Sequence, residues 1–416
     1  MRAGGPAARR LLRGGTLVAV AMMLFNLGAY GFTILAAHSL APADLGAVAA
    51  LLGLVLIGNV VASGLQTMAA RRVSAHPEHA GDLSAAALRS GLWAGAGFLA
   101  LAVVLAIPLD WVFHLTGWVA PLLAVATLAP ISVTGAISGV LQGCEAWGRL
   151  SAVYAANGVG RLGIGGVLVV ARPDAVGAML GLLLGALLPV VVGGYLLRHL
   201  PLPETAAASQ HETALFGIAT EVGHNAHTLA AFFTLSNLDA LAARVLLPTA
   251  LSGSYAAGLI VTKACLFLPQ FVIVVLFPSM ATAAHTSRVR WQALAAVAGL
   301  GGLAALAAFV LQDLVVTFIG GSKYAAVGPL AWRFALTGTV LACIQTLVME
   351  ELARSRRRAV WVLWAAVAGL GGLATVVAHD VASLVTLMLG GLVALLGGWL
   401  LRSRSPSQDS SPATPA

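Results

Sequence analysis

Twelve long apolar stretches, separated by short breaks that are polar or rich in proline and glycine, dominate the sequence. A helix needs about 20 apolar residues to cross the hydrocarbon core of a bilayer, and these stretches are of that length. The strands of a membrane β-barrel would instead alternate apolar and polar residues. The stretches lie approximately at 16–38, 44–69, 88–108, 118–142, 150–171, 175–197, 213–238, 250–278, 291–316, 326–349, 359–378 and 381–401.

The composition agrees with this pattern. Hydrophobic residues make up 59% of the chain and charged residues only 9%, whereas soluble proteins carry about 25% charged residues. So few charges cannot cover a surface that faces water. The sequence therefore predicts an all-α polytopic membrane protein with twelve transmembrane helices, and it excludes a large soluble catalytic domain.

The basic residues predict how the chain is oriented in the membrane. If the N-terminus is cytoplasmic, 17 of the 23 Lys and Arg residues fall in cytoplasmic segments, and only Arg172, Arg244 and Lys323 fall on the opposite side. Basic loops are retained on the cytoplasmic side. We therefore expect a multi-pass protein of the plasma or inner membrane with both termini in the cytoplasm. Because the arginines lie at the ends of apolar runs, where they set the orientation of the spans in the membrane, we expect no nucleic-acid binding.

A short pattern occurs twice and predicts an internal repeat. Residues Ala36, Ala37, Leu40 and Pro42 recur 206 positions later as Ala242, Ala243, Leu246 and Pro248, and Gly46 recurs as Gly253 after one inserted residue. Both copies fall in the turn between the first and second helices of a six-helix set, which predicts two parallel six-helix lobes. Chance matching of small residues is the alternative. The predicted parts are an N-terminal lobe at 1–200, a cytoplasmic linker at 201–212, a C-terminal lobe at 213–401 and a disordered tail at 402–416.

Both copies of the repeat resemble a known family. The segment AAHSLAPADLGAVAALLGLVL (Ala36–Leu56) is similar to the "LxPxxxGxYA" turn of the polysaccharide and oligosaccharide-lipid flippases, whose superfamily also contains the multidrug and toxin extruders, or MATE transporters. The segment LLPTALSGSYAAGLIVTKACLFLPQFVIVVLFPSMA (Leu246–Ala281) resembles the family's second copy, including the pair Phe277 and Pro278. The chain departs from the pattern at Val48, where the family has tyrosine.

The resemblance implies a MATE-like fold and a flippase activity. Such a protein moves a lipid-linked oligosaccharide or polysaccharide precursor, typically a polyprenyl-diphosphate glycan, from the inner to the outer leaflet by alternating access. The sugar and diphosphate would occupy a cavity between the lobes while the lipid tail stays in the bilayer. Glycosyltransferases of the same cell-surface polysaccharide pathway are then possible partners.

Ionisable and polar residues inside the predicted spans are the candidate site residues, because each needs a partner or a wet cavity within the membrane. Arg161 lies deep in the fifth span, with Tyr154 and Asn157 on the same helical face. Lys263 lies near the middle of the eighth span, with Gln270 on its face. We expect both cations to face the cavity; a hydrogen bond to a neighbouring helix is the alternative for Arg161.

Other polar residues allow two interpretations each. Arg333 is close enough to the external end of its span to reach the interface, so a cavity role and snorkelling are both possible. Asn26, Asn59 and Gln66 are candidates for binding sugar hydroxyls or for joining helices. Asp239, near the external end of the seventh span, is predicted to be solvated at the interface, as is Arg244.

The seventh span carries four polar residues on one face, namely Glu221, His224, Asn225 and Thr228. We interpret Glu221, His224 and Asn225 as candidate coupling or counter-ion residues, since a buried Glu and His can titrate near neutral pH. In a second interpretation, compatible with the first, Glu221 neutralises Arg161 or Lys263 across the lobe interface.

The charges inside the spans indicate the class of substrate. Three cations, Arg161, Lys263 and Arg333, stand against one deep carboxylate, so the cavity should be net positive and suit an anionic head group. The chain has no GxxxxGK[ST] phosphate loop. His76 and His79 lie in a loop without a further ligand close by, so we expect neither a cofactor nor a metal site.

Two other functions remain as alternatives. A cation-coupled multidrug exporter of the same superfamily would need a membrane carboxylate, and Glu221 is the candidate. A polytopic glycan polymerase or ligase would need a substantial external loop, whereas the predicted external connections are short. We therefore predict a transporter and not an enzyme. Within the sixth span, Gly177, Gly181 and Gly185 form a GxxxGxxxG stripe that predicts close helix packing.

Overall fold

The computed structural model describes residues 6–201, 227–280, 287–353 and 358–404. All of the secondary structure in these ranges is helical. The predicted linker, apart from residue 201, lies outside the described ranges, as does the predicted tail beyond Arg404, where the last helix ends.

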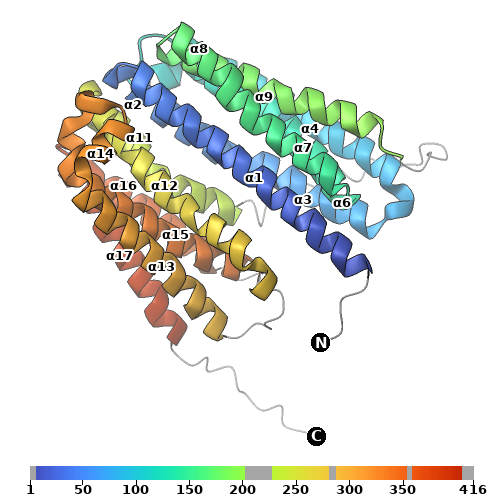
Figure 1. Cartoon of the computed structure of the whole chain (residues 1–416). Helices are drawn as coiled ribbons and strands as arrows, with labels where there is room; N and C mark the ends of the chain where they lie inside the picture. Colours follow the sequence, from blue (N-terminus) through green and yellow to red (C-terminus); the bar gives the residue numbers. More distant parts are fainter. Residues whose placement is uncertain (1–5, 202–226, 281–286, 354–357, 405–416) are drawn as a thin grey trace, which may run out of the picture.

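The N-terminal half forms one bundle, drawn in blue to green in Figure 1. Its helices are interrupted in several places, so that six spans are built from a larger number of segments. These are α1 (Pro6–Ser39), α2 (Pro42–Gly58), α3 (Val60–Ala75), η1 (Pro77–His79), α4 (Ala80–Val112), α5 (Val119–Ala126), α6 (Leu128–Gly143), α7 (Trp147–Val159), η2 (Gly160–Ile164), α8 (Gly165–Ala171) and α9 (Ala175–Arg198).

The C-terminal half forms a second bundle, drawn in yellow to red in Figure 1. Its first described span is the helix His227–Leu235, which continues into α11 (Leu238–Leu246) after a bend of 49°. The helices that follow are α12 (Thr249–Met280), α13 (Ser287–Val310), α14 (Gln312–Phe318), η3 (Gly321–Leu330), α15 (Ala331–Ala353), α16 (Arg358–Val377) and α17 (Val381–Arg404).

The number of spans agrees with the sequence. In the described ranges, 11 helices are long and apolar enough to cross a membrane, and the bent pair makes 12. Large apolar side chains are exposed on the outside of these helices, as on α4, where Trp93 is 72% exposed and Ile107 is 70% exposed. An exposed apolar surface of this kind suits lipid. The prediction of an all-α polytopic fold is therefore confirmed.

The two bundles, called the N-lobe and the C-lobe below, meet at one end and diverge towards the other (Figure 1). The start of α1 and the end of α17 both lie at the diverging end, which we call the terminal end; the other is the joined end. The two copies of the repeated turn pack against each other at the joined end. A Cβ atom on Gly46 would overlap Ser252, and one on Gly253 would overlap the Pro42 carbonyl. The repeat therefore places its two glycines at the contact between the lobes.

Glycines also allow close crossings within the N-lobe. A Cβ on Gly181 would lie 2.9 Å from the Cα of Gly165, and a Cβ on Gly185 would lie 2.5 Å from the carbonyl oxygen of Gly160. These contacts bring α9 against the fifth span without intervening side chains. The predicted packing role of the glycine stripe is confirmed.

We expect Gly185→Leu to destabilise the N-lobe by roughly 1–3 kcal/mol, because the new side chain would force apart α9 and the segment around Gly160. The measurement is the midpoint of thermal unfolding in detergent. Gly194→Leu on the same helix is the matched control, since a Cβ at Gly194 meets nothing within 4 Å. Equal midpoints for the two variants would contradict the close crossing.

Candidate functional site

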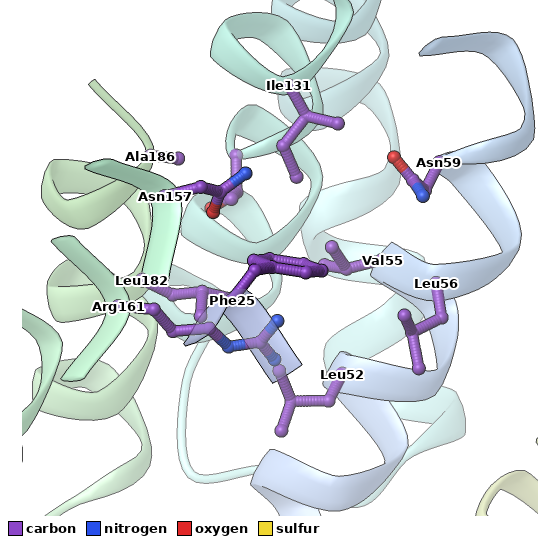
Figure 2. Close-up of a pocket in the computed structure, with 11 residues that line it drawn as sticks. Phe25, Leu52, Val55, Leu56, Asn59, Ile131, Asn157, Arg161, Leu182 and Ala186 are labelled. Carbon is purple, nitrogen blue, oxygen red and sulfur yellow. The ribbon is translucent and has the colours of Figure 1, made fainter. Parts of the chain in front are cut away.

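A cavity of about 80 Å³ lies inside the N-lobe, among its first, second, fourth, fifth and sixth spans (Figure 2). This volume holds several water molecules. Apolar side chains form most of its wall, and four polar residues interrupt it. The lining residues are Phe25, Leu52, Val55, Leu56, Asn59, Thr127, Ile131, Asn157, Arg161, Leu182 and Ala186.

Three of the polar lining residues lie where a helix is interrupted. Asn59 separates α2 from α3, and Thr127 separates α5 from α6. Arg161 lies in the π-helical turn η2, between α7 and α8. Irregular backbone inside a membrane protein is tolerated where it is buried in protein or lines a cavity, and single π-turns frequently mark functional sites. The interruptions therefore point to the same place as the polar side chains.

Arg161 is a partly buried cation without a hydrogen-bonding or ionic partner in the part of the chain that the structure describes. Within the described ranges its guanidinium makes no hydrogen bond or ion pair, and its Nε atom is buried and unsatisfied. Its Cζ atom lies 5.9 Å from the centre of the Phe32 ring. Such a contact stabilises a desolvated cation by about 2 kcal/mol, which is less than the cost of burying the charge. Figure 2 shows the guanidinium directed towards Phe25 and Leu52.

The two asparagines of the cavity leave their amides available. Neither Asn59 nor Asn157 makes a side-chain hydrogen bond to another described residue, and Figure 2 shows both side chains directed into the cavity. The Thr127 hydroxyl, by contrast, donates to the Leu123 carbonyl at 2.7 Å. Guanidinium and amide groups can together bind an anionic group that also carries hydroxyls.

The predicted polar face of the fifth span divides into two parts. Asn157 and Arg161 line the cavity, whereas the Tyr154 hydroxyl accepts a hydrogen bond from Gln66 Nε2 at 2.9 Å. Gln66 Nε2 also donates to Gln142 Oε1 at 3.0 Å. Gln66 therefore joins helices. Asn26 lies on α1 next to Phe25 but is not among the residues that line the cavity.

Lys263 belongs to a separate polar cluster in the C-lobe. Its Nζ atom donates to the Ser236 carbonyl at 2.7 Å and to Asn237 Oδ1 at 3.0 Å, at the bend before α11. Asp239, only 4% exposed, interacts electrostatically with Lys263, although no direct ion pair joins them. Tyr255 is fully buried nearby, and its hydroxyl has no partner among the described residues.

Arg333 lies at a third place, between α15 and α17. Its Nη1 atom donates to Thr386 Oγ1 at 2.9 Å, and its Cζ atom lies 5.3 Å from the centre of the Trp332 ring. It lines a surface pocket of about 450 Å³ together with Asp380 and Ser383. The backbone N–H of Ser383 donates to Asp380 and lowers the pKa of its carboxyl group.

The structure therefore does not bring the three predicted cations together, and of these three only Arg161 lines the N-lobe cavity. The candidate coupling residues Glu221, His224 and Asn225 lie outside the described ranges and remain predictions.

The prediction that Asp239 and Arg244 are solvated is wrong. Each is only 4% exposed, because the seventh span packs against the N-lobe at this level and hides both side chains. Sequence reasoning named Arg244 but did not predict that it contacts the N-lobe. The available signal was its place inside the second copy of the repeated turn, next to Ala243.

Comparison with solved structures identifies the arrangement of helices. One structure, described as the inward-facing conformation of a multidrug resistance MATE family transporter of the MOP superfamily, matches with a TM-score of 0.68 at 15% identity, covering 94% of this chain and 98% of that chain. The chain has the MATE transporter fold. The outward-facing conformation of a transporter of the same description matches this MATE fold with a TM-score of 0.51 at 17% identity, covering 95% of this chain and 94% of that one.

A eukaryotic MATE transporter also shares the fold, with a TM-score of 0.54, 13% identity and coverage of 94% of this chain and 96% of that chain. No protein-family model and no curated protein matches the sequence. The MATE fold is therefore established by structure, at identities too low to carry a substrate across. It is the fold of a polytopic membrane transporter.

We expect Arg161→Met to leave the thermal unfolding midpoint unchanged or higher, because the substitution removes a partly buried charge that lacks a hydrogen-bonding or ionic partner among the described residues. Ligand binding in the cavity should fall in the same variant. The midpoint is measured in detergent without ligand. A clear loss of stability would show that Arg161 holds helices together and would contradict a binding role.

A second expectation concerns the C-lobe cluster. Lys263→Met should destabilise the protein by roughly 1–3 kcal/mol, because it removes the donor of the hydrogen bonds to Ser236 and Asn237 and a cation near the buried Asp239. The double variant Lys263→Met/Asp239→Asn should recover part of this loss, as measured by thermal unfolding in a double-mutant cycle. Additive losses from the two single substitutions would show that the charges are not coupled.

Proposed function

We propose that the protein is a membrane transporter that flips a lipid-linked oligosaccharide or polysaccharide precursor, a polyprenyl-diphosphate glycan, for cell-surface polysaccharide biosynthesis. The observation that carries the proposal is the unpartnered Arg161 guanidinium in the N-lobe cavity, beside the free amides of Asn59 and Asn157. The guanidinium suits a phosphate oxygen and the amides suit sugar hydroxyls. The MATE fold supplies a scaffold of two lobes in which such a site can alternate between the two sides.

The arrangement of the lobes supports an inward-facing state. With the predicted topology, the joined end faces outwards and the terminal end faces the cytoplasm, where lipid-linked precursors would enter. The better match to the inward-facing than to the outward-facing MATE structure, with TM-scores of 0.68 and 0.51, agrees with this interpretation. The diphosphate would bind at Arg161 in this state, with the lipid tail left in the bilayer.

The other predicted parts of the cycle remain proposals. Glu221, His224 and Asn225 are candidates for coupling transport to a proton or another ion, and glycosyltransferases of the same pathway are candidate partners. Lys263 and Arg333, held by other groups in this conformation, would reach the substrate only after the helices around them rearrange.

A second candidate function is cation-coupled export of drugs. Two observations favour it: the matched inward-facing structure is described as a multidrug resistance transporter, and Asp239 is a buried carboxylate of the kind that binds a proton or sodium ion. The carboxylate already interacts with Lys263, however, and Arg161 would repel a cationic drug in the N-lobe cavity.

The two candidates are separated by transport in proteoliposomes. We expect the wild-type protein to move a fluorescent short-chain polyprenyl-diphosphate sugar between leaflets, scored by its accessibility to a membrane-impermeant quencher. Arg161→Met should reduce the rate at least tenfold, since a hydrogen bond to a charged group contributes about 1.5–3 kcal/mol.

Arg172→Gln is the control for this assay, because Arg172 pairs with Asp174 on an exposed loop away from the cavity. Accumulation of a cationic dye under a proton or sodium gradient, without movement of the diphosphate lipid, would overturn the flippase proposal in favour of the exporter.

A further inference from the structure

Two cationic side chains of the C-lobe reach across to the N-lobe at the joined end. The first is Arg244 on α11. Its guanidinium donates to three backbone carbonyls of the N-lobe: Nε to Phe113 at 2.7 Å, Nη1 to Ala43 at 2.9 Å and Nη2 to His114 at 2.9 Å. Only 4% of Arg244 is exposed, so this contact between the lobes is sealed from its surroundings.

The second cation is Lys323, near the start of η3. Its Nζ atom donates to the carbonyls of Ala37, His38 and Leu40 at 3.2, 2.8 and 3.1 Å. Ala37 and His38 lie in the last turn of α1 and Leu40 directly follows it. The last carbonyls of a helix have no N–H partner within the helix and carry its negative partial charge. Lys323 therefore satisfies the open end of a helix in the other lobe.

The two contacts are related by the internal repeat. In the alignment of the two copies, Arg244 is equivalent to His38, whose carbonyl accepts from Lys323. In each contact, the turn after the first span of one lobe meets the loop between the third and fourth spans of the other. The two are not chemically equivalent, because both cations belong to the C-lobe and all six carbonyls belong to the N-lobe.

Neither cation is neutralised by a direct carboxylate partner within the described ranges. Asp44 interacts electrostatically with Arg244, but its Oδ1 atom accepts from the Ala175 N–H at 3.3 Å and makes no ion pair with the guanidinium. Arg244 Nη1 also donates to the Ser252 hydroxyl, at 3.3 Å. Both cations are thus held mainly by neutral acceptors, and hydrogen bonds to an ionised oxygen are stronger than these.

We propose that Arg244 and Lys323 form an anion site on the exit path, which N-lobe carbonyls occupy in this conformation and the phosphate groups of the substrate occupy when the lobes separate. The identity of the anion rests on the proposed function. Separation of the lobes takes six carbonyl acceptors from the two cations at once. Phosphate oxygens replace these acceptors with charge-assisted bonds, and departure of the anion returns the cations to the carbonyls and closes the joined end.

The test measures the distance between spin labels on the two lobes at the joined end, placed at Trp118 and Leu251 in a protein whose three native cysteines are replaced by alanine. We expect a short distance in the wild-type protein and a larger population of longer distances in Lys323→Gln and Arg244→Gln. Lys323 is exposed, so Lys323→Gln tests the contact even if Arg244→Gln fails to fold. Arg172→Gln, a charge removed from the same predicted side, should leave the distance unchanged.

The second half of the experiment tests ligand binding, with geranyl diphosphate, a water-soluble prenyl diphosphate, as the probe. Its addition should lengthen the distance in the wild-type protein, and calorimetry in an Arg161→Met background should show binding weakened about tenfold by Lys323→Gln. Lys323→Arg should restore binding. An unchanged distance in Lys323→Gln, or equal affinity in Lys323→Gln and Arg172→Gln, would overturn the proposal.

Failure of the proposed function gives a different result. A wild-type protein that moves no diphosphate lipid, but whose joined end still opens with geranyl diphosphate through Lys323 and Arg244, retains the anion site and loses the flippase assignment.

Discussion

Polar groups inside this protein must find partners within the chain, because the surrounding hydrocarbon offers none. Most hydroxyls meet this requirement locally, as Ser132 and Thr134 do by donating to carbonyls one turn earlier on α6. The exceptions are informative. Arg161 is left without a hydrogen-bond partner in a cavity, whereas Arg244 finds its three carbonyl partners in the other lobe. The partners of each charge inside the bundle therefore distinguish the candidate site from a contact that holds the lobes together.

The lobes use their buried charges differently, although they share a repeat. In the N-lobe, Arg161 faces free amides across a small cavity. In the C-lobe, Lys263 is held by the Ser236 carbonyl and Asn237 beside a buried carboxylate, so that its charge is satisfied internally. The N-lobe thus contains a cation and two amides without hydrogen-bond partners among the described residues, whereas the C-lobe contains a closed polar cluster at a bent helix and supplies the cations that join the halves.

The sequence predicted what depends on local composition. The spans follow from the length of the apolar stretches. The close helix packing follows from the spacing of the glycines in the stripe that ends at Gly185, and the repeated turn follows from matched residues such as Pro42 and Pro248. It predicted that Arg161 and Asn157 share a helical face, and both line the cavity.

It did not predict the partners of the cations. Those depend on how helices far apart in the chain rotate and pack, as Arg244 and Phe113 show with their separation of 131 residues. The interruption of the fifth span at Gly160 was equally hidden, since a π-turn has no fixed residue pattern in one sequence.

The π-turn affects the direction in which the Arg161 side chain points. A π-turn holds one residue more than an α-helical turn, and one residue corresponds to about 100° of rotation in an α-helix. The span around Gly160–Ile164 therefore carries a built-in phase shift, which sets the face of α8 independently of that of α7. If the π-turn moved by one turn along the span, the Arg161 side chain would rotate away from the amides of Asn59 and Asn157, while both ends of the helix stayed in place. The orientation of the charge thus depends on where the π-turn lies along the span, and not on the ends of the helix alone.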